Sequence, residues 1–428
     1  MIGTNLTEYG VTSVSMLGLS LLFIAVLFVL FANRKKAIFS IIAFVCFVPI
    51  AQRLVLAGID FSFLRILVLA GLMRVLIRGE YSSVKFNNLD YISMALAMAS
   101  VVFFTMGQLS VSVFIYKLGN ALDSLGLYLL FRALFRSWDD VYYVVRSLVL
   151  ISFPVALFFL YEWKTGHNLF SILGGVPERT YARDGMLRCQ GAFNHPITAG
   201  VFWGTLIPIC FAYRYMGSKF VANLSILFIS ITVVTTATST GLMAIMMALI
   251  GVLFVCFRGA IKVILISLVP ILIFLHLVMN GPVWSLLAKV NILSSSTGWQ
   301  RYYLIDMAIE HFSDWWMFGT PSTAYWGWGL WDITNEYIWQ GAQGGLASML
   351  LFVALLVVAF RAVHEVVDKF DEKNVKFAVV WAFGATLFSF TVTFFSISAY
   401  GQILFSLTLM LALIASTLEK ERAIENEK

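Results

Sequence analysis

Charged residues are scarce in this chain: Asp, Glu, Lys and Arg make up only 12% of its 428 residues, against about 25% in soluble domains. Hydrophobic residues make up 60%, and the mean hydropathy is +0.89. This composition argues against several soluble domains and predicts an all-α polytopic protein, with residues 1–428 forming one integral membrane domain. The net charge of +6 is typical of basic cytoplasmic loops, so we expect the lipid bilayer, and no nucleic acid, as a partner.

Other signals are also missing. Three of the four cysteines lie in apolar segments and Cys189 stands alone in a polar loop, so there is no disulfide framework and no metal-ligand spacing. The first ten residues contain no Lys or Arg, which a secretory signal would have, so the first apolar run is expected to be a retained helix. The absence of GxxxxGK[ST] and GxGxxG loops disfavours a cytoplasmic enzyme that uses nucleotides, and no cofactor is expected.

The chain contains apolar runs in place of these motifs. A spanning helix needs about 20 mostly apolar residues. Thirteen runs qualify, and the third is the least secure because it contains Arg65 and Arg74, so we expect 12 or 13 spans. The runs are 13–32, 37–58, 61–77, 91–107, 110–130, 142–161, 197–213, 220–237, 241–257, 261–279, 341–360, 377–396 and 400–417.

The distribution of positive charge predicts the orientation. With the N-terminus outside, eighteen of the 29 Lys and Arg residues fall in inner loops, five inside apolar runs and six outside. Basic residues concentrate on the cytoplasmic side of membrane proteins, so the C-terminus is expected inside. All six outer residues lie in two long loops, 162–196 and 280–340, where we expect the chemistry.

The first long loop ends in "RCQGAFNHP", from Arg188 to Pro196. Arg179, Arg183 and Arg188 fall within ten residues, against the trend for outer loops, and this implies an anionic ligand. Arginine keeps its charge and offers a planar fork to phosphate oxygens, so Arg188 is a candidate phosphate clamp. The alternative is an interfacial arginine that holds phospholipid head groups.

Gly191 and His195 can each be explained either by the local structure of the loop or by a role in function. Gly191 is expected to be a turn residue in either case. Asn194 can cap a helix whose first turn contains Pro196, so His195 could belong to a helix start alone. The functional reading makes His195 a group that orients or deprotonates a substrate hydroxyl.

The second long loop contains "TGWQRYYLIDMAIEHFSDWWMFG", which predicts a helix along the membrane surface. Arg301 lies near its start, either as a ligand-binding cation or as a solvated charge. Asn335 and Glu336 precede the span expected to begin at Gly341. Asp332 and Glu336 would share a face if this piece were helical, and Glu336 is either a general base or a surface charge.

Three further cations lie inside apolar runs, where charge is costly and marks a functional hypothesis. Arg53 and Arg65 flank a short outer turn around Asp60, so both are expected to reach outward toward the long loops. Lys117 and Asp123 could form an ordinary buried pair.

These residues resemble a family. "RCQGAFNHP" is similar to the Arg-x-x-Gly-x-Phe-x-His-Pro stretch of the bacterial O-antigen ligase and polymerase superfamily. "VPIAQRLVLAGIDFSFLRILVLAGLMRVLIRG" and "GNALDSLGLYLLFRALF" resemble the early helices of that superfamily. "RYYLIDMAIEHFSDWWMFG" resembles its Arg-led segment, and "TNEYIWQGAQGGLASMLLF" resembles the start of a late helix. The resemblance covers most of residues 45–360.

The resemblance implies a bacterial inner-membrane glycosyltransferase whose active face is in the periplasm, the side on which the charge distribution places the N-terminus. The donor would be a glycan on a polyprenyl-pyrophosphate carrier. A polymerase would extend another lipid-linked repeat in O-antigen, exopolysaccharide or capsule synthesis, beside a flippase and a chain-length regulator. A ligase would transfer the glycan to lipid A-core or protein. Ligases have a His where this chain has Thr334, and "TTATSTGLMA" lacks the frequent Ser-Arg pair, so polymerase is favoured.

On this reading, the catalytic residues are Arg188, Arg301, Glu336 and His195, with the two arginines on the leaving pyrophosphate. The substrate-binding residues are Arg183, Arg53, Arg65, Asn335 and Gly191. No metal is expected because no DxD-like outer pair occurs, although Asp332 and Glu336 leave that open. A lipid or polysaccharide transporter is the alternative from another class, and would be expected to line a midplane path with polar groups.

Overall fold

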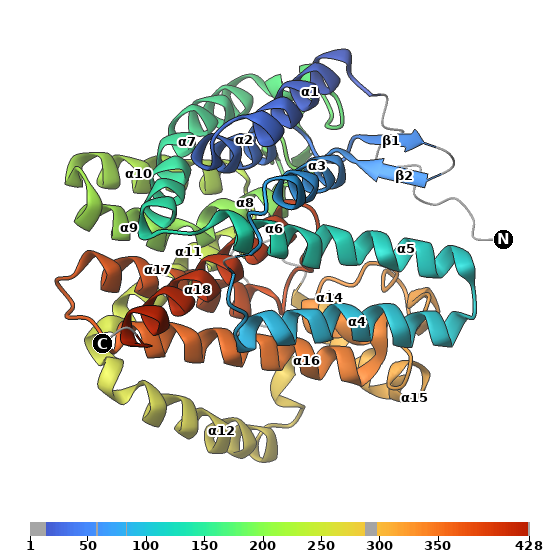
Figure 1. Ribbon diagram of the computed structural model, residues 1–428. Coiled ribbons are helices and arrows are strands. Elements are labelled where there is room, and N and C mark those ends of the chain that lie inside the picture. The colour runs from blue at the N-terminus through green and yellow to red at the C-terminus, as the bar shows by residue number, and fades with distance from the viewer. Residues whose placement is uncertain (1–13, 57–58, 83, 287–297, 427–428) are drawn as a thin grey trace.

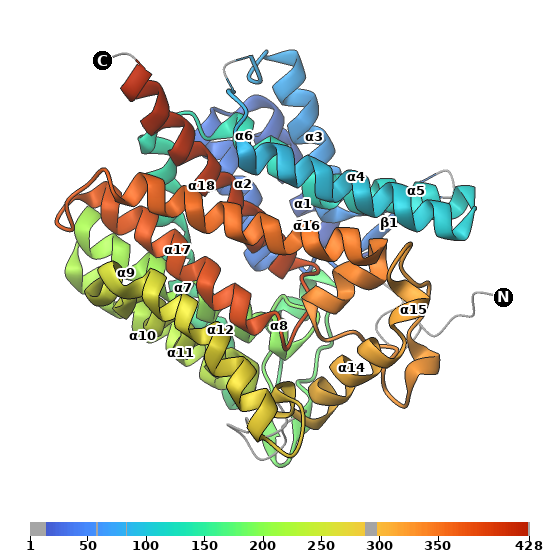
Figure 2. The ribbon, with the colours of Figure 1, turned by 90° about the horizontal axis from the view of Figure 1, so that it is seen from below.

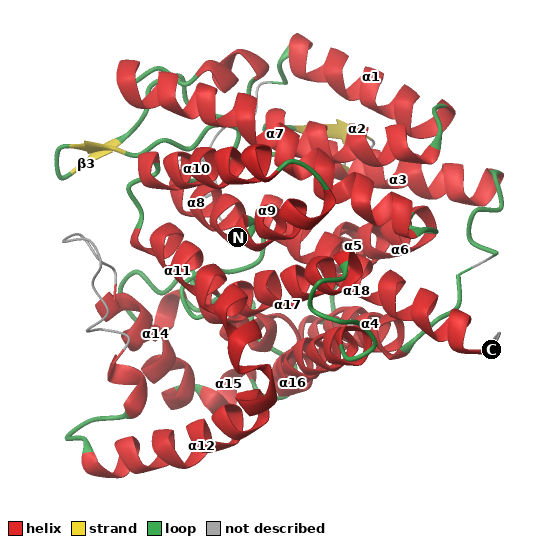
Figure 3. Ribbon diagram, turned by 90° about the vertical axis from the view of Figure 1, so that its left-hand side faces the viewer, coloured by secondary structure: helices red, strands yellow, loops and turns green. Residues whose placement is uncertain are grey.

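The computed structural model describes residues 14–56, 59–82, 84–286 and 298–426. Helices dominate this part of the chain (Figure 3), and the described strands form two short antiparallel hairpins. In the first, β1 (Arg53–Leu56) pairs with β2 (Ile59–Ser62). In the second, β3 (Ala182–Arg183) pairs with β4 (Met186–Leu187). The architecture is therefore α-helical, as the composition predicts.

Seven described helices or joined helix pairs are long and apolar enough to cross a membrane. Their length and composition make the protein a multi-pass membrane protein, and a helix occurs at each of the thirteen predicted positions. The exact number of spans stays a prediction. The seven are α4 (Asn88–Gln108), α7 (Trp138–Thr165), α8 with α9 (Pro196–Met216), α11 with the 3-10 helix after it (Ser239–Ala260), α16 (Glu336–Val367), α17 (Val375–Thr393) and the span Gln402–Glu425 in α18.

The other elements are shorter, or are parts of those spans. The helices are α1 (Met16–Phe31), α2 (Arg34–Phe47), α3 (Phe63–Ile77), α5 (Val111–Ala121), α6 (Leu127–Leu134), α8 (Pro196–Thr205), α9 (Ile207–Met216), α10 (Lys219–Thr235), α11 (Ser239–Leu253), α12 (Ile261–Val278), α14 (Gly298–Glu310), α15 (Phe312–Trp315) and α18 (Gln402–Asn426). Segments of 3-10 helix are Leu169–Leu173, Phe254–Ala260, Val283–Ser285 and Ala324–Trp326, and a π-helical turn, Leu122–Gly126, joins α5 to α6.

Charged pairs gather at one end of the helix bundle. Arg132 bonds to Asp90 at 2.7 Å, and Arg422 bonds to Glu365 at 2.6 Å. The opposite end contains both long loops, and Figure 1 shows α15, which belongs to the second of them, on its right-hand side. Six ion pairs thus gather at the end that the charge distribution assigns to the cytoplasm. The remaining pairs at that end include Lys35–Asp139, Arg258–Glu372, Lys369–Glu425 and Lys376–Glu421.

The second predicted span differs from the structure. Residues 37–58 were expected to be one helix, but α2 ends at Phe47 and the chain then forms the β1–β2 hairpin. Pro49 explains the end, because proline disfavours helical backbone at the residue before it. Val48 is indeed extended, with φ −103° and ψ 124°.

α16 begins earlier than predicted and is broken. It starts at Glu336, not at Gly341, and its backbone leaves the helical region at Gly344 and Gly345, where φ is −178° and +72°. A segment of the second long loop fills this break. The Thr320 N–H donates to the Ala342 carbonyl at 2.9 Å, and the Leu346 N–H donates to the Trp316 carbonyl at 2.7 Å. A side chain at Gly345 would overlap backbone atoms of Met317, so the break requires glycine there.

Lys117 binds the backbone at the break in α16. Its Nζ donates to the backbone and side-chain oxygens of Gln343, both at 2.7 Å, and lies 3.9 Å from the centre of the Phe104 ring. The suggested Lys117–Asp123 pair does not form, because Asp123 binds Arg65. Lys117 therefore satisfies a carbonyl that the broken helix leaves without its usual donor.

The second long loop forms a cap with its own small core. Leu304 and Ala308 of α14 pack with Trp315 of α15, with Trp326 and Leu330, and with the start of α16. Figure 2 shows α14 and α15 beside one end of α16. The predicted surface helix is thus two helices with a break at His311, and the cap is fixed to the bundle.

Candidate functional site

The end of the first long loop is a tight hairpin that leads into α8. Asp184 and Gly185 occupy its turn with φ +52° and +75°, the backbone that Asp-Gly favours between antiparallel strands. The Arg188 N–H donates to the Tyr181 carbonyl at 2.9 Å and extends the ladder by one pair. Since residues opposite each other and alternate residues of a strand share a face, Arg183 and Arg188 lie on one face of the hairpin. The Oδ2 of Asp184 lies 3.9 Å from the Nε of Arg183.

Glu162, in the last turn of α7, holds the loop after Arg188 in place. Its carboxylate is buried, and it accepts hydrogen bonds from the N–H groups of Gln190 at 3.0 Å and Gly191 at 2.9 Å. Gly191 has φ +56°, and a side chain there would overlap the Phe159 ring. Gly191 is therefore a required turn residue, as the sequence predicts, and its role is to shape the loop.

His195 is the N-cap of α8. Its Nδ1 accepts a hydrogen bond from the Ile197 N–H at 3.1 Å, so His195, and not Asn194, provides the cap. Burial and the nearby charge of Arg188 lower the pKa of His195 to about 4. The ring is therefore neutral near pH 7, with its proton on Nε2. In this tautomer His195 can donate a hydrogen bond to a ligand, whereas its other nitrogen is occupied.

The turn between α10 and α11 packs against this loop. The Thr235 carbonyl accepts a hydrogen bond from the Cys189 N–H at 3.0 Å. Gly200 of α8 faces Gly241 of α11, and Gly204 faces Ala244 one turn further along both helices. α8 and α11 therefore run parallel and begin at the same end of the molecule. Their N-terminal N–H groups place two partial positive charges there.

Arg301 reaches the same place from the second long loop. Its Nη2 donates to Thr240 Oγ1, in the first turn of α11, at 2.8 Å. Only 8% of Arg301 is exposed, and Nε has no hydrogen-bond partner among the described residues. No carboxylate in that part of the chain pairs with it either. Burial lowers the pKa of Arg301, but a guanidinium stays charged at neutral pH. A buried cation of this kind favours an anionic ligand.

Glu336 and Asn335 both make hydrogen bonds that stabilise the fold. The Asn335 side chain caps α16 through the Ile338 N–H at 3.2 Å. Glu336 is buried; its Oε2 accepts from the Ala399 N–H at 2.5 Å and its Oε1 from Gln340 Nε2 at 2.7 Å. Glu336 thus ties α16 to the turn between α17 and α18, an arrangement that favours a positioning role over that of a base. Asp332 lies outside the helix and is exposed, so the expected shared face does not form.

Arg53 and Arg65 lie in the first hairpin and the helix that follows it. Arg53 is exposed on β1. Arg65 binds Asp123 with two hydrogen bonds, at 2.9 Å and 2.5 Å. The charge of Arg65 is therefore already balanced by a carboxylate, unlike that of Arg301. Asp60, which the sequence places between them, lies in β2.

A cavity of about 730 Å³ opens between α4 and the cap. Its lining includes the rings of Trp316, Phe318 and Tyr325 and the carboxylate of Asp314. The Tyr325 hydroxyl donates to Asp314 at 2.9 Å, and this bond and the contact with His311 lower the pKa of Asp314. The cavity thus offers aromatic faces beside an ionised carboxylate, on the same side of the molecule as both long loops.

The sequence did not single out Glu162 or Thr240. Both make their contacts through the fold: Glu162 with backbone groups 28 and 29 residues away, and Thr240 with Arg301, 61 residues away. The acidic residue at the outer end of an apolar run was the available signal for Glu162, and Thr240 had none. No cluster of three or more His, Cys, Asp or Glu side chains in the described residues could hold a metal ion.

Comparison with known protein families finds no family model that matches this chain, and comparison with curated proteins finds no match either.

Proposed function

We propose that this site binds the diphosphate of a lipid-linked glycan, and that the protein is a glycan polymerase acting on the outer face of a bacterial inner membrane. Arg301 is the observation that carries the proposal. It is a buried cation without a carboxylate partner in the described chain, it contacts the first turn of α11, and α8 begins beside it. Two helix N-termini and an arginine form a positive field suited to phosphate oxygens.

The proposed reaction replaces one bond at the anomeric carbon of the donor sugar. The acceptor hydroxyl oxygen bonds to that carbon, and the bond from carbon to the diphosphate oxygen breaks. The products are the longer glycan and the lipid diphosphate, which takes up the proton of the acceptor. Negative charge grows on the diphosphate as the bond breaks, so fixed cations near that oxygen lower the barrier. Arg188 and Arg301 fill this role, with Arg183 beside Arg188 on the hairpin face.

His195 and Glu336 take different parts from those first considered. His195 donates from Nε2 and so orients a phosphate or hydroxyl oxygen. Glu336 and Asn335 position α16 and the turn after α17. Gly191 gives the loop its shape. The cavity lined by Trp316 and the other aromatic residues would hold the acceptor, because the apolar faces of sugars pack on aromatic rings.

Two other readings remain as outcomes of the test. A ligase would use the same donor, and Thr334, in place of the histidine of ligases, is the residue that disfavours it. A transporter is favoured by one observation, the broken helix α16, because transporters often bind substrates at such breaks. Here, however, Lys117 and the segment before Thr320 already occupy the broken backbone.

The direct experiment uses purified protein with a polyprenyl-diphosphate-linked repeat unit, without nucleotide or ion gradient. We expect longer glycans and free lipid diphosphate. Transfer to lipid A-core alone would show a ligase, and no product would contradict both enzyme readings. The matched control is Arg179→Ala, since Arg179 is exposed in the same loop as Arg188.

The orientation can be tested separately. Reporter fusions after Lys36 and Lys373 are expected to give cytoplasmic signals, and a fusion after Asp314 a periplasmic one. A cytoplasmic signal at Asp314 would place the site on the wrong face for an exported lipid-linked donor and would overturn the proposal.

A further inference from the structure

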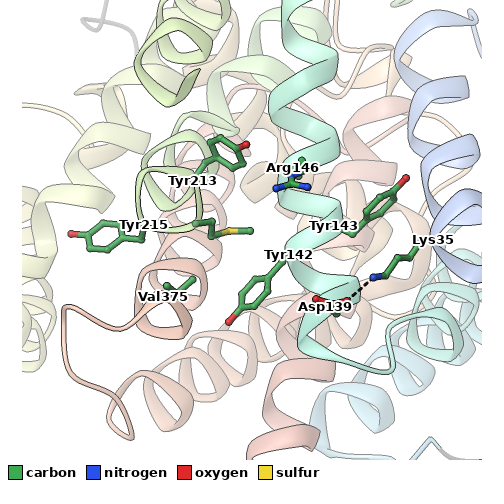
Figure 4. Close-up of a pocket in the computed structure, with 9 residues that line it drawn as sticks. Lys35, Asp139, Tyr142, Tyr143, Arg146, Tyr213, Tyr215 and Val375 are labelled. Carbon is green, nitrogen blue, oxygen red and sulfur yellow. Dashed lines mark hydrogen bonds and ion pairs between the residues drawn. The ribbon is translucent and has the colours of Figure 1, made fainter. Parts of the chain in front are cut away.

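A second cavity lies at the opposite end of the molecule, among the charged pairs. It measures about 470 Å³ and is drawn in Figure 4. Its lining comes from the start of α2, the first part of α7, the end of α9 and the start of α17. The lining residues are Lys35, Asp139, Tyr142, Tyr143, Arg146, Tyr213, Tyr215, Met216 and Val375.

The cavity carries an excess of positive charge. Lys35 and Asp139 form an ion pair at 2.6 Å, so their charges balance. Arg146 makes no hydrogen bond or ion pair with the residues that the structure describes, which leaves one positive charge without compensation. Tyr142 and Tyr143 on α7 and Tyr213 on α9 also line the cavity, and their hydroxyls likewise bond to no other described residue. These groups can all donate to an anion.

The position of Arg146 indicates that the anion belongs to a lipid. Arg146 lies eight residues after the start of α7 at Trp138, roughly 12 Å along the helix axis. The same exposed stripe of α7 continues through Leu150, Pro154 and Leu157. This stripe is apolar apart from Arg146, as expected of a face in contact with acyl chains. A ligand held here would thus have its charge in the cavity and its apolar part along α7.

We propose that this cavity binds the phosphate head group of an anionic phospholipid from the leaflet at that end of the molecule. Arg146 and the nearby tyrosine hydroxyls hold the phosphate, and Leu150 and Leu157 contact the acyl chains. Its volume suits a head group, since cavities of about 300–1,000 Å³ hold small ligands. Basic cavities between helices on the cytoplasmic side are a known form of lipid recognition. The proposal does not depend on the activity at the other end.

The test compares lipid binding by the full-length wild type and by Arg146→Gln in a neutral detergent. Native mass spectrometry would count bound phosphatidylglycerol, with phosphatidylcholine as the zwitterionic comparison. Hydrogen bonds to charged groups contribute about 1.5–3 kcal/mol, so the apparent Kd for phosphatidylglycerol should rise at least about tenfold in Arg146→Gln. Arg361→Gln, an exposed arginine on α16, is the matched control and should bind as the wild type does.

Two further measurements keep the outcome clear. Tyr213→Phe removes one hydroxyl and leaves the ring, so it should weaken binding less than Arg146→Gln does, and the melting temperature of each variant checks its folding. Inorganic pyrophosphate is added as a soluble competitor and should not displace the lipid. Equal binding by wild type and Arg146→Gln, equal retention of phosphatidylcholine, or displacement by pyrophosphate would each overturn the proposal.

Discussion

Replacing Arg301 with Met should abolish activity without weakening the fold. Methionine keeps the unbranched stem and its packing but removes the charge. The structural loss is one hydrogen bond to Thr240 at 2.8 Å, a bond of about 1.5–3 kcal/mol for a charged donor. The substitution also removes a buried cation that has no carboxylate partner in the described chain. Burying such a charge costs about several kcal/mol, so its removal is stabilising. We therefore expect an unchanged or higher melting temperature.

The activity should change in the opposite direction. Removing one fixed donor from a developing anion costs about 10²–10³ in rate, so glycan transfer by Arg301→Met should fall at least about 100-fold. Inorganic pyrophosphate should raise the melting temperature of the wild type, because a ligand stabilises the state that binds it, and should not raise that of the variant. Activity and stability are measured on the same detergent-purified samples.

Arg65→Met is the matched control, because the same substitution there leaves Asp123 without its partner. Breaking such a pair is destabilising, so this variant should melt at a lower temperature. The reasoning about Arg301 would be refuted if Arg301→Met also lowered the melting temperature, since Arg301 would then be a structural residue. Near-normal transfer by Arg301→Met would refute its role in the reaction.

The remaining predictions concern the first long loop. Arg188→Ala should lose product at normal protein levels and Arg188→Lys should recover little, because lysine lacks the planar fork; product assays with Arg179→Ala as control check this. Since the pKa of His195 is lowered to about 4, the folded state binds fewer protons than the unfolded state between that value and about 6.5. Stability should therefore fall on acidification through this window, and melting curves of His195→Asn should show a flatter pH dependence. Gly191→Ala should lower the melting temperature, as it adds a side chain at positive φ against Phe159; a wild-type melting curve would contradict the assigned clash.

Short sequence patterns correctly predicted several local features of this structure. The helix starting at Pro196, the turn at Gly191 and the helical state of α14 follow from residue types over a few positions. Pro49 also indicated the end of α2. We nevertheless expected one helix over residues 37–58, because the whole run is apolar. Element boundaries of this kind are decided by one or two residues within an otherwise uniform composition.

Contacts between distant segments could not be predicted in this way. The partner of Lys117 is Gln343, which is far away in the sequence and accepts only because α16 breaks beside it. Nothing in the sequence indicated that the Glu336 carboxylate has a partner. That partner is the backbone N–H of Ala399, and a backbone group cannot be identified from residue types. Polar residues in a membrane domain must find partners, but the sequence does not say which.

The break in α16 has a consequence for how the chain is inserted into the membrane. The stretch from Leu346 to Val367 is long enough to cross the bilayer alone, whereas the short piece from Glu336 to Gln343 is not. That short piece is held by the cap, through Thr320 and Trp316, and by Lys117. Because these contacts come from the cap, we expect the short piece to reach its final position only after the cap has folded. We therefore expect two stages in the formation of α16: the long piece inserts by itself, and folding of the cap then adds the short piece.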